Sequence, residues 1–461
     1  MIFEQHYLDC LSQASYLIGD ETTGRAVVVD PRRDVAVYLD SAAEHGLAIE
    51  LVIETHFHAD FLSGHLELAA ATGATIVYGE AAETDFAIRH VADRERLSLG
   101  EVTLEFLATP GHTPESISVV VYERAEDEVP YGVLTGDTLF IGDVGRPDLL
   151  ASVGITADDL ARSLHASLHD KLMRLPDATR VFPAHGAGSA CGRNLSTETQ
   201  STIGAQRVEN YAVQPMSVDE FVRRVTDGQP LAPGYFGYDA NLNRRDRTLL
   251  DESATASPLS LEQVQAAMDS GAVVLDTRDA VDFAVGHLRS SINVGADGRF
   301  AEYAGSVVGH DTDVVLVTEA GGEHDARIRL GRIGYDHVIG HLEDPVRTFS
   351  EHPDVVTRSS RLSALQLAER RRDVPDLVVL DVRSPGELSA GSIPGAVHVP
   401  VASLEARLSD LDPTAPTVVH CAGGYRSILA ASYLTAHGFD DVSDLLGGYG
   451  AWADMAIEPP T

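Results

Sequence analysis

The sequence predicts a multidomain α/β protein in which a sandwich of two sheets with outer helices is followed by two smaller domains built on parallel sheets. The 461 residues exceed what one hydrophobic core usually holds. The first half is rich in short apolar, strand-like runs with a few helical patterns between them. The second half contains a unit of about a hundred residues that is repeated once.

The first half opens with a predicted hairpin. Two apolar runs between Ser15 and Asp30 flank the turn-forming residues 20–24. Strand-like runs then predominate until about Phe140. A passage rich in Pro, Gly and Asn, Pro230 to Asn243, ends this region. Helical periodicity is expected at residues 34–46, 62–73 and 157–174.

The second half repeats itself. The run Ala-Val-Val-Leu-Asp-Thr-Arg at 272–278 matches Leu-Val-Val-Leu-Asp-Val-Arg at 377–383. Both copies alternate short buried-type strands with amphipathic helices, a pattern typical of a parallel sheet covered on two faces. A segment rich in Ser, Thr and Ala precedes the first copy and is expected to be a linker. The predicted limits are 1–250 for the first domain, 251–258 for the linker, and 259–355 and 356–461 for the two copies.

Charge and composition narrow the possible partners. The formal net charge of −36 argues against nucleic acid or an anionic membrane surface, since both need neutralising cations. No apolar run approaches the roughly 18 residues of a membrane span, and no export signal is visible at the N-terminus. We therefore expect a cytoplasmic protein. Three widely spaced cysteines fit reduced thiols better than disulfides, and Cys10, in an apolar setting, is expected to be structural.

Histidines and acids follow several of the predicted strands. Residues 55–60, Thr-His-Phe-His-Ala-Asp, come directly after the apolar run 51–53. His112 and Asp137 each also follow a strand-like run. Two imidazoles and one carboxylate suit a metal ion, and these ligand types alone allow either zinc or Fe(II).

Together with the run 181–186, Val-Phe-Pro-Ala-His-Gly, these motifs resemble the metallo-β-lactamase fold and, within it, the persulfide dioxygenases rather than the hydrolases. The resemblance covers roughly the first half of the chain and implies an αββα sandwich. It implies one Fe(II) per chain, held by His56, His112 and Asp137. The shell around the metal is expected to contain His58, Asp60 and His185. His185 matches a second-metal ligand of the hydrolases, and we expect it here to be a remnant that forms hydrogen bonds near the site.

Phe61 favours one metal over two. It places an apolar ring where a two-metal version of this loop would carry another histidine, and losing a ligand should weaken a second metal site severely. Two histidines and one carboxylate leave up to three coordination positions free, the pattern of Fe(II) enzymes that bind substrate and dioxygen together.

The resemblance also implies a substrate. A low-molecular-weight persulfide, carried by glutathione, coenzyme A or a similar thiol, would be oxidised with O2 to sulfite and free thiol. Two roles are open for Arg146. In the first, its guanidinium orients the loop or pairs with a substrate carboxylate. In the second, it closes the loop by an ion pair with Asp148 or Asp143. Cys191 lies in a stretch that resembles multidomain fusions of this family. It either exchanges sulfur near the iron or is a structural thiol.

The two repeats resemble rhodanese domains. In the second copy, Cys421 follows a strand-like run and precedes a helical one, so backbone N–H groups and the helix N-terminus would stabilise its thiolate. Arg426 closes a six-position loop, which resembles sulfur-transferring rhodaneses. The loop consists of Cys421, Ala422, Gly423, Gly424, Tyr425 and Arg426. In the first copy Glu319 is expected to replace the nucleophile, and because a carboxylate cannot carry sulfane sulfur, this copy should be inactive.

The two halves together predict a coupled reaction. Sulfite from the iron site would accept sulfane sulfur from Cys421 to give thiosulfate, or the reverse reaction would supply persulfide. The alternatives are a thioester hydrolase of the glyoxalase II type with an attached sulfurtransferase, and a non-catalytic sulfide sensor or scaffold. Similar fusions imply a homo-oligomer.

Overall fold

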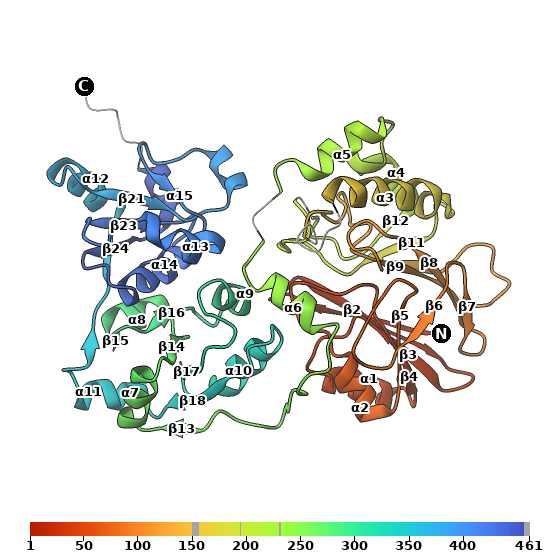
Figure 1. Cartoon of the computed structure of the whole chain (residues 1–461), viewed down its shortest axis with the longest axis horizontal. Coiled ribbons are helices and arrows are strands. Elements are labelled where there is room, and N and C mark those ends of the chain that lie inside the picture. Colours follow the sequence, from red (N-terminus) through yellow and green to blue (C-terminus); the bar gives the residue numbers. More distant parts are fainter. Residues whose placement is uncertain (150–155, 194, 230–231, 456–461) are drawn as a thin grey trace. The chain divides into compact units, whose positions relative to one another are not determined.

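The computed structural model describes residues 1–149, 156–193, 195–229 and 232–455. Two compact units are seen, one formed by Met1–Ala232 with Phe236–Asp251 and the other by Pro233–Tyr235 with Glu252–Thr461 (Figure 1). The expected α/β architecture is confirmed in both units. No helix in the described part of the chain is long and apolar enough to cross a membrane.

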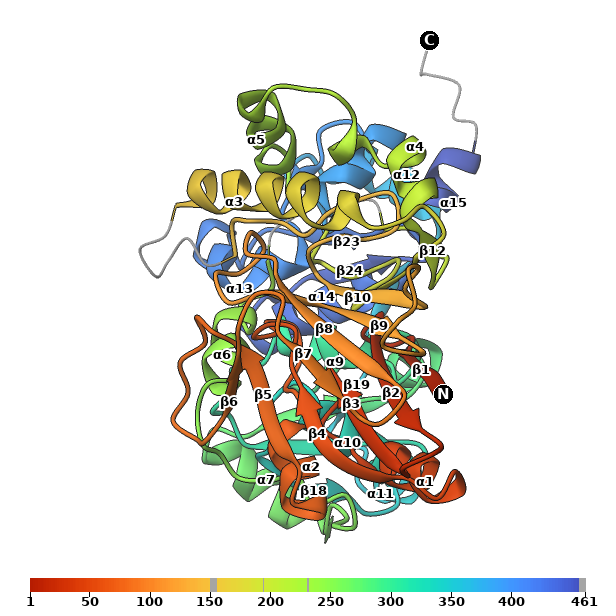
Figure 2. The same ribbon diagram turned by 90° about the vertical axis from the view of Figure 1, so that its right-hand side faces the viewer.

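The first unit is a sandwich of two six-stranded sheets (Figure 2). The first sheet has the order β1 (Ile2–Leu8), β2 (Gln13–Asp20), β3 (Arg25–Val29), β4 (Ala48–Ile53), β5 (Thr75–Gly79), β6 (Arg89–Val91). The second has the order β12 (Ser201–Thr202), β11 (Arg180–Pro183), β10 (Gly132–Gly136), β9 (Ile117–Tyr122), β8 (Thr103–Ala108), β7 (Arg96–Ser98). The predicted hairpin is the antiparallel pair β2–β3, whereas β3, β4 and β5 run parallel.

Helices cover the outer face of each sheet. Tyr38 and Leu68, from the helices of the first sheet, pack on Val28 and Val52. Those helices are α1 (Ala36–Glu44) and α2 (His65–Thr72). Over the second sheet lie α3 (Ala157–Asp170), α4 (Ile203–Glu209) and α5 (Val218–Thr226), with 3-10 turns η2 (Leu172–Arg174) and η3 (Tyr211–Val213).

One sequence expectation for this unit needs correction. The helix expected over 157–174 ends at Asp170, and a separate 3-10 turn follows. The passage 230–243, which was expected to end the region, contains helix α6 from Phe236 to Leu242. Its first two residues, 230 and 231, lie outside the described residues. The glycine and asparagine of this helix are tolerated because Phe236, Asp239 and Ala240 are buried against the domain.

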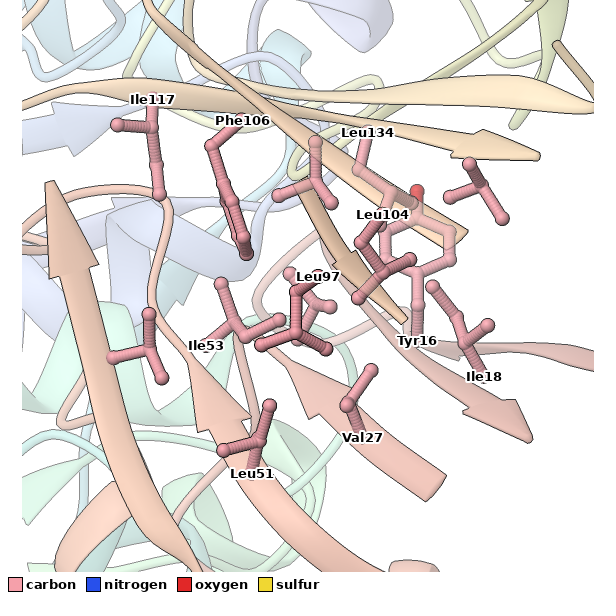
Figure 3. Close-up of a cluster of buried hydrophobic side chains, with 14 of the residues drawn as sticks. Tyr16, Ile18, Val27, Leu51, Ile53, Leu97, Leu104, Phe106, Ile117 and Leu134 are labelled. Atoms are coloured by element: carbon pink, nitrogen blue, oxygen red, sulfur yellow. The ribbon is translucent and has the colours of Figure 1, made fainter. Parts of the chain in front are cut away.

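The core of the sandwich lies between the two sheets (Figure 3). Strand alternation sends Val27 and Val29 inward, whereas Val28 between them packs under the outer helices. Each large apolar side chain buried in this way contributes about 1.5–3 kcal/mol. The facing side chains include Tyr16, Ile18, Val27, Leu51 and Ile53 from the first sheet and Leu97, Leu104, Phe106, Ile117 and Leu134 from the second.

The second unit contains the sequence repeat as two five-stranded parallel sheets. The first copy has the order β13 (Pro258–Leu259), β18 (Val338–Leu342), β17 (Val314–Val317), β14 (Val273–Asp276), β16 (Ile292–Asn293). The second has the order β20 (Ser360–Leu362), β24 (Val442–Leu445), β23 (Thr417–His420), β21 (Val378–Asp381), β22 (Val397–His398). An antiparallel pair, β15 (His287–Leu288) with β19 (Val356–Thr357), lies outside these sheets. The two sheets have the same strand order, as a duplication requires.

The helices of the two copies also correspond. The first helix of each copy begins with a capping box, Ser260 with Gln263 and Ser363 with Gln366. The first copy has α7 (Leu261–Asp269), α8 (Ala280–Val285), α9 (Phe300–Gly305), α10 (Glu323–Gly331) and α11 (Pro345–Glu351). The second has α12 (Ala364–Asp373), α13 (Leu404–Arg407), α14 (Tyr425–Ala436), α15 (Gly448–Asp454) and the 3-10 turns η4 (Pro385–Ala390), η5 (Val401–Ser403) and η6 (Leu408–Asp410).

Candidate metal centre and cysteine loop

The three predicted metal ligands meet at the carboxyl ends of three strands. His56 follows β4, His112 follows β8 and Asp137 follows β10. The Oδ2 atom of Asp137 lies 3.8 Å from Nε2 of His56 and 3.6 Å from Nε2 of His112. All three side chains are buried, and their ligand atoms lie within 4.8 Å of one another. Two imidazoles and one carboxylate so placed form a candidate site for one metal ion.

The hydrogen bonds of both histidines leave their Nε2 lone pairs free for a metal. Nδ1 of His112 donates to the backbone oxygen of Arg146 at 2.9 Å. Nδ1 of His56 lies 3.0 Å from the Thr55 hydroxyl, which donates its own proton to Asp30, so His56 must be the donor. Second partners of this kind fix the tautomer and orientation of metal-ligating imidazoles.

The cluster fits a cation. Nε2 of His56 and Oδ2 of Asp137 are buried and have no hydrogen-bond partner among the described residues. Two buried acceptors without donors would be costly, but a metal ion between them would satisfy both. Burial lowers the pKa of His56 well below its ordinary value, and the neighbouring His58 adds to this effect. The imidazole is therefore neutral, as metal binding requires.

His185, which follows β11, orients Asp137. Its Nδ1 lies 2.7 Å from Oδ1 of Asp137, and its Nε2 lies 2.9 Å from Oδ2 of Asp60. Burial opposes a charge on His185, but the two carboxylates outweigh it and raise its pKa well above the ordinary value. Burial likewise acts to raise the pKa of Asp137, yet His185 holds it below the ordinary value. His185 is thus a charged hydrogen-bonding neighbour of the ligand set.

His58 belongs to a second buried cluster that sequence analysis missed. Its Nε2 lies 3.2 Å from Asp30 Oδ1 and 3.8 Å from Glu54 Oε2. Burial, with the charge of Asp30, raises the pKa of Glu54 well above its ordinary value. Glu54 also lies 3.2 Å from Nδ1 of His65. The signal was present in the sequence, because Glu54 directly precedes the histidine motif and Asp30 ends a strand.

Asn243 was also missed, although it fixes the loop that carries the motif. Its amide nitrogen donates to the backbone oxygens of His58 at 2.9 Å and Phe61 at 2.8 Å. Its side-chain oxygen accepts from the backbone N–H of Ser63 at 2.9 Å. The Phe61 ring that this loop presents packs against His58, with ring centroids 4.4 Å apart. Nothing local to Asn243 indicates this contact, because it spans 180 residues or more.

Arg146 and Cys191 lie next to the metal cluster. The Arg146 guanidinium donates to both carboxylate oxygens of Asp148, at 2.8 and 2.7 Å, and to the backbone oxygen of Ala190. This geometry favours the loop-closing role with Asp148 over binding of a substrate carboxylate. The sulfur of Cys191 lies within 4.8 Å of ligand atoms of Asp137 and His185. Burial raises the pKa of the Cys191 thiol well above its ordinary value, so the side chain is a neutral thiol.

In the second unit, Cys421 lies at the turn between β23 and α14. The backbone N–H of Gly424 donates to its sulfur at 3.1 Å. Gly424 has a φ of 112°, which an L side chain rarely adopts, and this conformation turns the N–H inward. Gly448 must also be glycine, because a Cβ there would lie 2.4 Å from the backbone oxygen of Cys421. The loop is therefore held closely on both sides of the thiol.

Arg426 is tied to an acid that sequence analysis did not identify. Its two terminal nitrogens donate to the carboxylate oxygens of Glu387 at 2.7 and 2.6 Å. Burial alone would raise the pKa of Glu387, but the hydrogen bond and charge of Arg426 lower it to about 2. Such a bidentate pair fixes the guanidinium plane beside the loop.

The nucleophile position of the first copy falls on Thr318 when counted from the strand and on Glu319 when counted from the helix. Asp276 of β14 pairs with Val317, and its counterpart Asp381 of β21 pairs with His420, so Thr318 follows its strand as Cys421 does. Glu319 lies three residues before Gly322, the N-cap of α10, as Cys421 lies three residues before Gly424, the N-cap of α14. The loop of the first copy is therefore one residue longer. Neither side chain can carry sulfane sulfur, and the inactivity of this copy stays a prediction.

Comparison with known proteins matches each half of the chain to a protein family. Residues 8–185 match the metallo-beta-lactamase superfamily, and residues 260–345 and 363–455 match the rhodanese-like domain. The mitochondrial persulfide dioxygenase ETHE1 of Homo sapiens is 29% identical over 213 residues, covering 45% of this chain and 74% of the relative. The cytoplasmic hydroxyacylglutathione hydrolase of Arabidopsis thaliana is 34% identical over 182 residues, covering 39% of this chain and 66% of the relative.

A solved structure extends the likeness across both halves. The metallo-beta-lactamase from Staphylococcus aureus subsp. aureus COL is 32% identical, covers 74% of this chain and 98% of its own, and has a TM-score of 0.67. The chain therefore belongs to the metallo-β-lactamase superfamily, with persulfide dioxygenases among its homologues and two rhodanese-like domains in tandem.

Proposed function

We propose that the protein oxidises low-molecular-weight persulfides with O2 to sulfite and thiol at one Fe(II), held by His56, His112 and Asp137, and transfers sulfane sulfur through Cys421. The observation that carries this proposal is the ligand set. Two imidazole Nε2 atoms and one carboxylate oxygen meet in a buried cluster, and two of these three atoms have no hydrogen-bond partner among the described residues. The persulfide dioxygenases among the relatives support the same reaction class.

The protein's own residues bind the metal and orient its ligands. A ferrous ion bound by the three ligands would supply the redox chemistry that lets O2 react with a persulfide sulfur. His185 holds one oxygen of Asp137, which leaves the other for the metal. The apolar ring of Phe61 takes the place of a further ligand and packs against His58. These contacts favour a single metal over a pair.

The sulfur-transfer step at Cys421 uses a second molecule of the substrate persulfide. The Cys421 thiolate attacks its outer sulfur, the S–S bond of the substrate breaks, and the carrier leaves as a thiolate. The sulfur of sulfite attacks the outer sulfur of a Cys421 persulfide, and the S–S bond breaks. Thiosulfate leaves, and the electron pair of the broken bond stays on the Cys421 sulfur as a thiolate. The Gly424 N–H, 3.1 Å from that sulfur, and the N-terminus of α14 stabilise the negative charge. The same step in reverse would load Cys421 from thiosulfate.

Several finer assignments belong to this proposal. Glutathione, coenzyme A or a similar thiol carries the persulfide, and the chain acts as a homo-oligomer. The domain limits are proposed at 1–250, 259–355 and 356–461, with 251–258 as the linker. Residues 456–461 lie outside the described part of the chain. The cytoplasmic location stays a prediction.

Thioester hydrolysis is the second candidate. The 34% identity with the hydroxyacylglutathione hydrolase of Arabidopsis favours it. A second group of possible ligands also favours thioester hydrolysis. Ligand atoms of His58, Asp60 and His185 lie within 4.8 Å of one another, as a second metal would require. Phe61 argues against it, since a second metal would lose a histidine.

One experiment separates the two candidates. The purified chain is analysed for metal, and the same sample is given glutathione persulfide with an oxygen electrode and, separately, a glutathione thioester. We expect about one iron per chain, oxygen uptake and no thioester hydrolysis. Stoichiometric zinc with thioester hydrolysis and no oxygen uptake would refute the dioxygenase.

Product analysis tests the coupling of the two sites. Wild-type protein should release thiosulfate, whereas Cys421→Ser should stop at sulfite with unchanged oxygen uptake. Cys10→Ser is the matched control, because Cys10 belongs to neither site and should leave the products as in wild type. An unchanged thiosulfate yield from Cys421→Ser would refute the coupling.

A further inference from the structure

The copy without a nucleophile contacts the loop that carries Cys421. The hydroxyl of Tyr425, a residue of this loop, donates to the backbone oxygen of Gly295 in the first copy at 2.6 Å. One face of α14 follows the same surface, because the Ser432 hydroxyl accepts from the backbone N–H of Asn293 at 3.0 Å. The Cys421 loop and the helix that follows it therefore rest on the end of β16 and the turn after it.

A second tyrosine extends from the first copy toward the loop. Tyr303 lies on α9, and its ring centroid is 5.4 Å from that of Tyr425. The residue is half-buried, and in the described part of the chain its hydroxyl has no hydrogen-bond partner. Burial raises the pKa of Tyr303; the charge of Arg426 opposes that rise and the charge of Cys421 adds to it. The ring contact with Tyr425 therefore places Tyr303 against the Cys421 loop.

The first copy holds Tyr303 in a fixed position. Arg329 donates to the backbone oxygens of Ala296 and, at 2.6 Å, of Gly298, which fixes the turn before α9. The same guanidinium lies over the ring of Phe300, 5.2 Å from its centroid. Arg329 is buried, and its hydrogen bonds fix the turn from which α9 and Tyr303 extend.

Two donors beside Cys421 are already engaged within the second copy. Arg426 gives both terminal nitrogens to Glu387, and the Gly424 N–H points at the sulfur. Sulfite and thiosulfate carry three oxygens and two negative charges, so they need donors beyond those that bind the sulfane sulfur. A tyrosine hydroxyl without a partner can supply one.

We propose that the inactive copy completes the sulfur-acceptor site, with the Tyr303 hydroxyl donating a hydrogen bond to an oxygen of a small sulfur oxyanion such as sulfite or thiosulfate. Tyr425 is a positioning residue that fixes the Cys421 loop against Gly295. The inference rests on the proposed function, because it assigns an acceptor site to the same transfer step. It gives the first copy a role in choosing the acceptor.

The test compares two acceptors on the full-length protein. Cys421 is first loaded with sulfane sulfur from thiosulfate, and its discharge by sulfite and by cyanide is followed. For Tyr303→Phe we expect the KM for sulfite to rise on the order of tenfold, as for loss of one hydrogen bond to a charged group, with kcat changed less than about twofold. Discharge by cyanide, which has no oxygen to accept the bond, should be unchanged. The phenylalanine ring keeps the packing on Tyr425.

Tyr433→Phe is the matched control. It removes a hydroxyl from α14 about 12 Å farther along the helix and should leave both acceptors unaffected. An unchanged KM for sulfite in Tyr303→Phe, or an equal loss with sulfite and cyanide, would overturn the inference while leaving the sulfurtransferase intact. Failure of the wild-type protein to discharge sulfur to either acceptor would overturn the proposed function, and this inference with it.

Discussion

Nδ1 of His185 lies 2.7 Å from Oδ1 of Asp137, so the carboxylate turns its other oxygen, Oδ2, toward His56 and His112. The metal cluster is therefore supported by a residue that is not itself one of the three ligands. Asp60, on the other side of the imidazole, keeps His185 charged. The effect of His185 on the metal should be measurable apart from that of the ligands.

His185→Gln should weaken metal binding about 10- to 100-fold without abolishing it, because loss of a supporting hydrogen bond misorients a ligand. His112→Ala, which removes a ligand, should leave almost no bound metal. Competition with a chelator, followed by metal analysis, measures both. His90→Gln, at an exposed position on β6, is the control and should bind metal like the wild type. Equal metal loss in His185→Gln and His112→Ala would mean that His185 is itself a ligand.

Phe61→His should raise the metal content from about one to about two ions per chain. The new imidazole would join His58, Asp60 and His185 on the side of the cluster where Phe61 now places its ring, and a fourth protein ligand completes a tetrahedral site for a second ion. Metal analysis after dialysis is the measurement. Phe61→Leu keeps the position apolar and should stay at one ion. A single ion in Phe61→His would show that the ring is not what excludes the second metal.

Local signals in the sequence predict where the three proposed metal ligands lie, because each follows an apolar run typical of a buried strand. His56, His112 and Asp137 could therefore be assigned to strand ends without a structure. The duplication in the second half could also be predicted, from the matching runs at 272–278 and 377–383. What the sequence did not indicate were contacts across large separations, such as Asn243 with the histidine loop and Tyr425 with Gly295. The extra residue in the loop of the first copy, between β17 and α10, was likewise visible only in the structure, since the two loop sequences have diverged.

Asn243→Ala should lower the free energy of unfolding by about 1–3 kcal/mol, because it leaves two backbone oxygens and one N–H of the histidine loop without their partner. The metal affinity should fall as well, since the loop carries His56. Thermal unfolding and metal titration of the same variant are the measurements. Asn241→Ala, two residues earlier at an exposed position of α6, should change neither. Normal unfolding and metal binding in Asn243→Ala would show that the loop is fixed by other contacts.

The Glu387–Arg426 pair predicts a pH dependence for the Cys421 loop. The pKa of Glu387 is lowered from 4.5 to about 2 in the folded protein, in which its hydrogen bond with Arg426 outweighs burial. A carboxyl group with a lowered folded pKa stabilises the fold above its unfolded pKa, and this stabilisation is lost as the pH falls from about 4.5 towards about 2. At neutral pH, Glu387→Gln should therefore unfold at a lower temperature than the wild type.

The difference between Glu387→Gln and wild type should shrink progressively below about pH 4.5, because protonated Glu387 and glutamine both lack the charge that pairs with Arg426. Melting temperatures of the two proteins at matched pH values from neutral to about 3 measure this difference. Glu351→Gln, at an exposed position on α11, controls for the general loss of one negative charge. A constant gap over the whole pH range would mean that the carboxylate charge of Glu387 does not hold Arg426 in place, and that the glutamine variant differs from wild type only through packing.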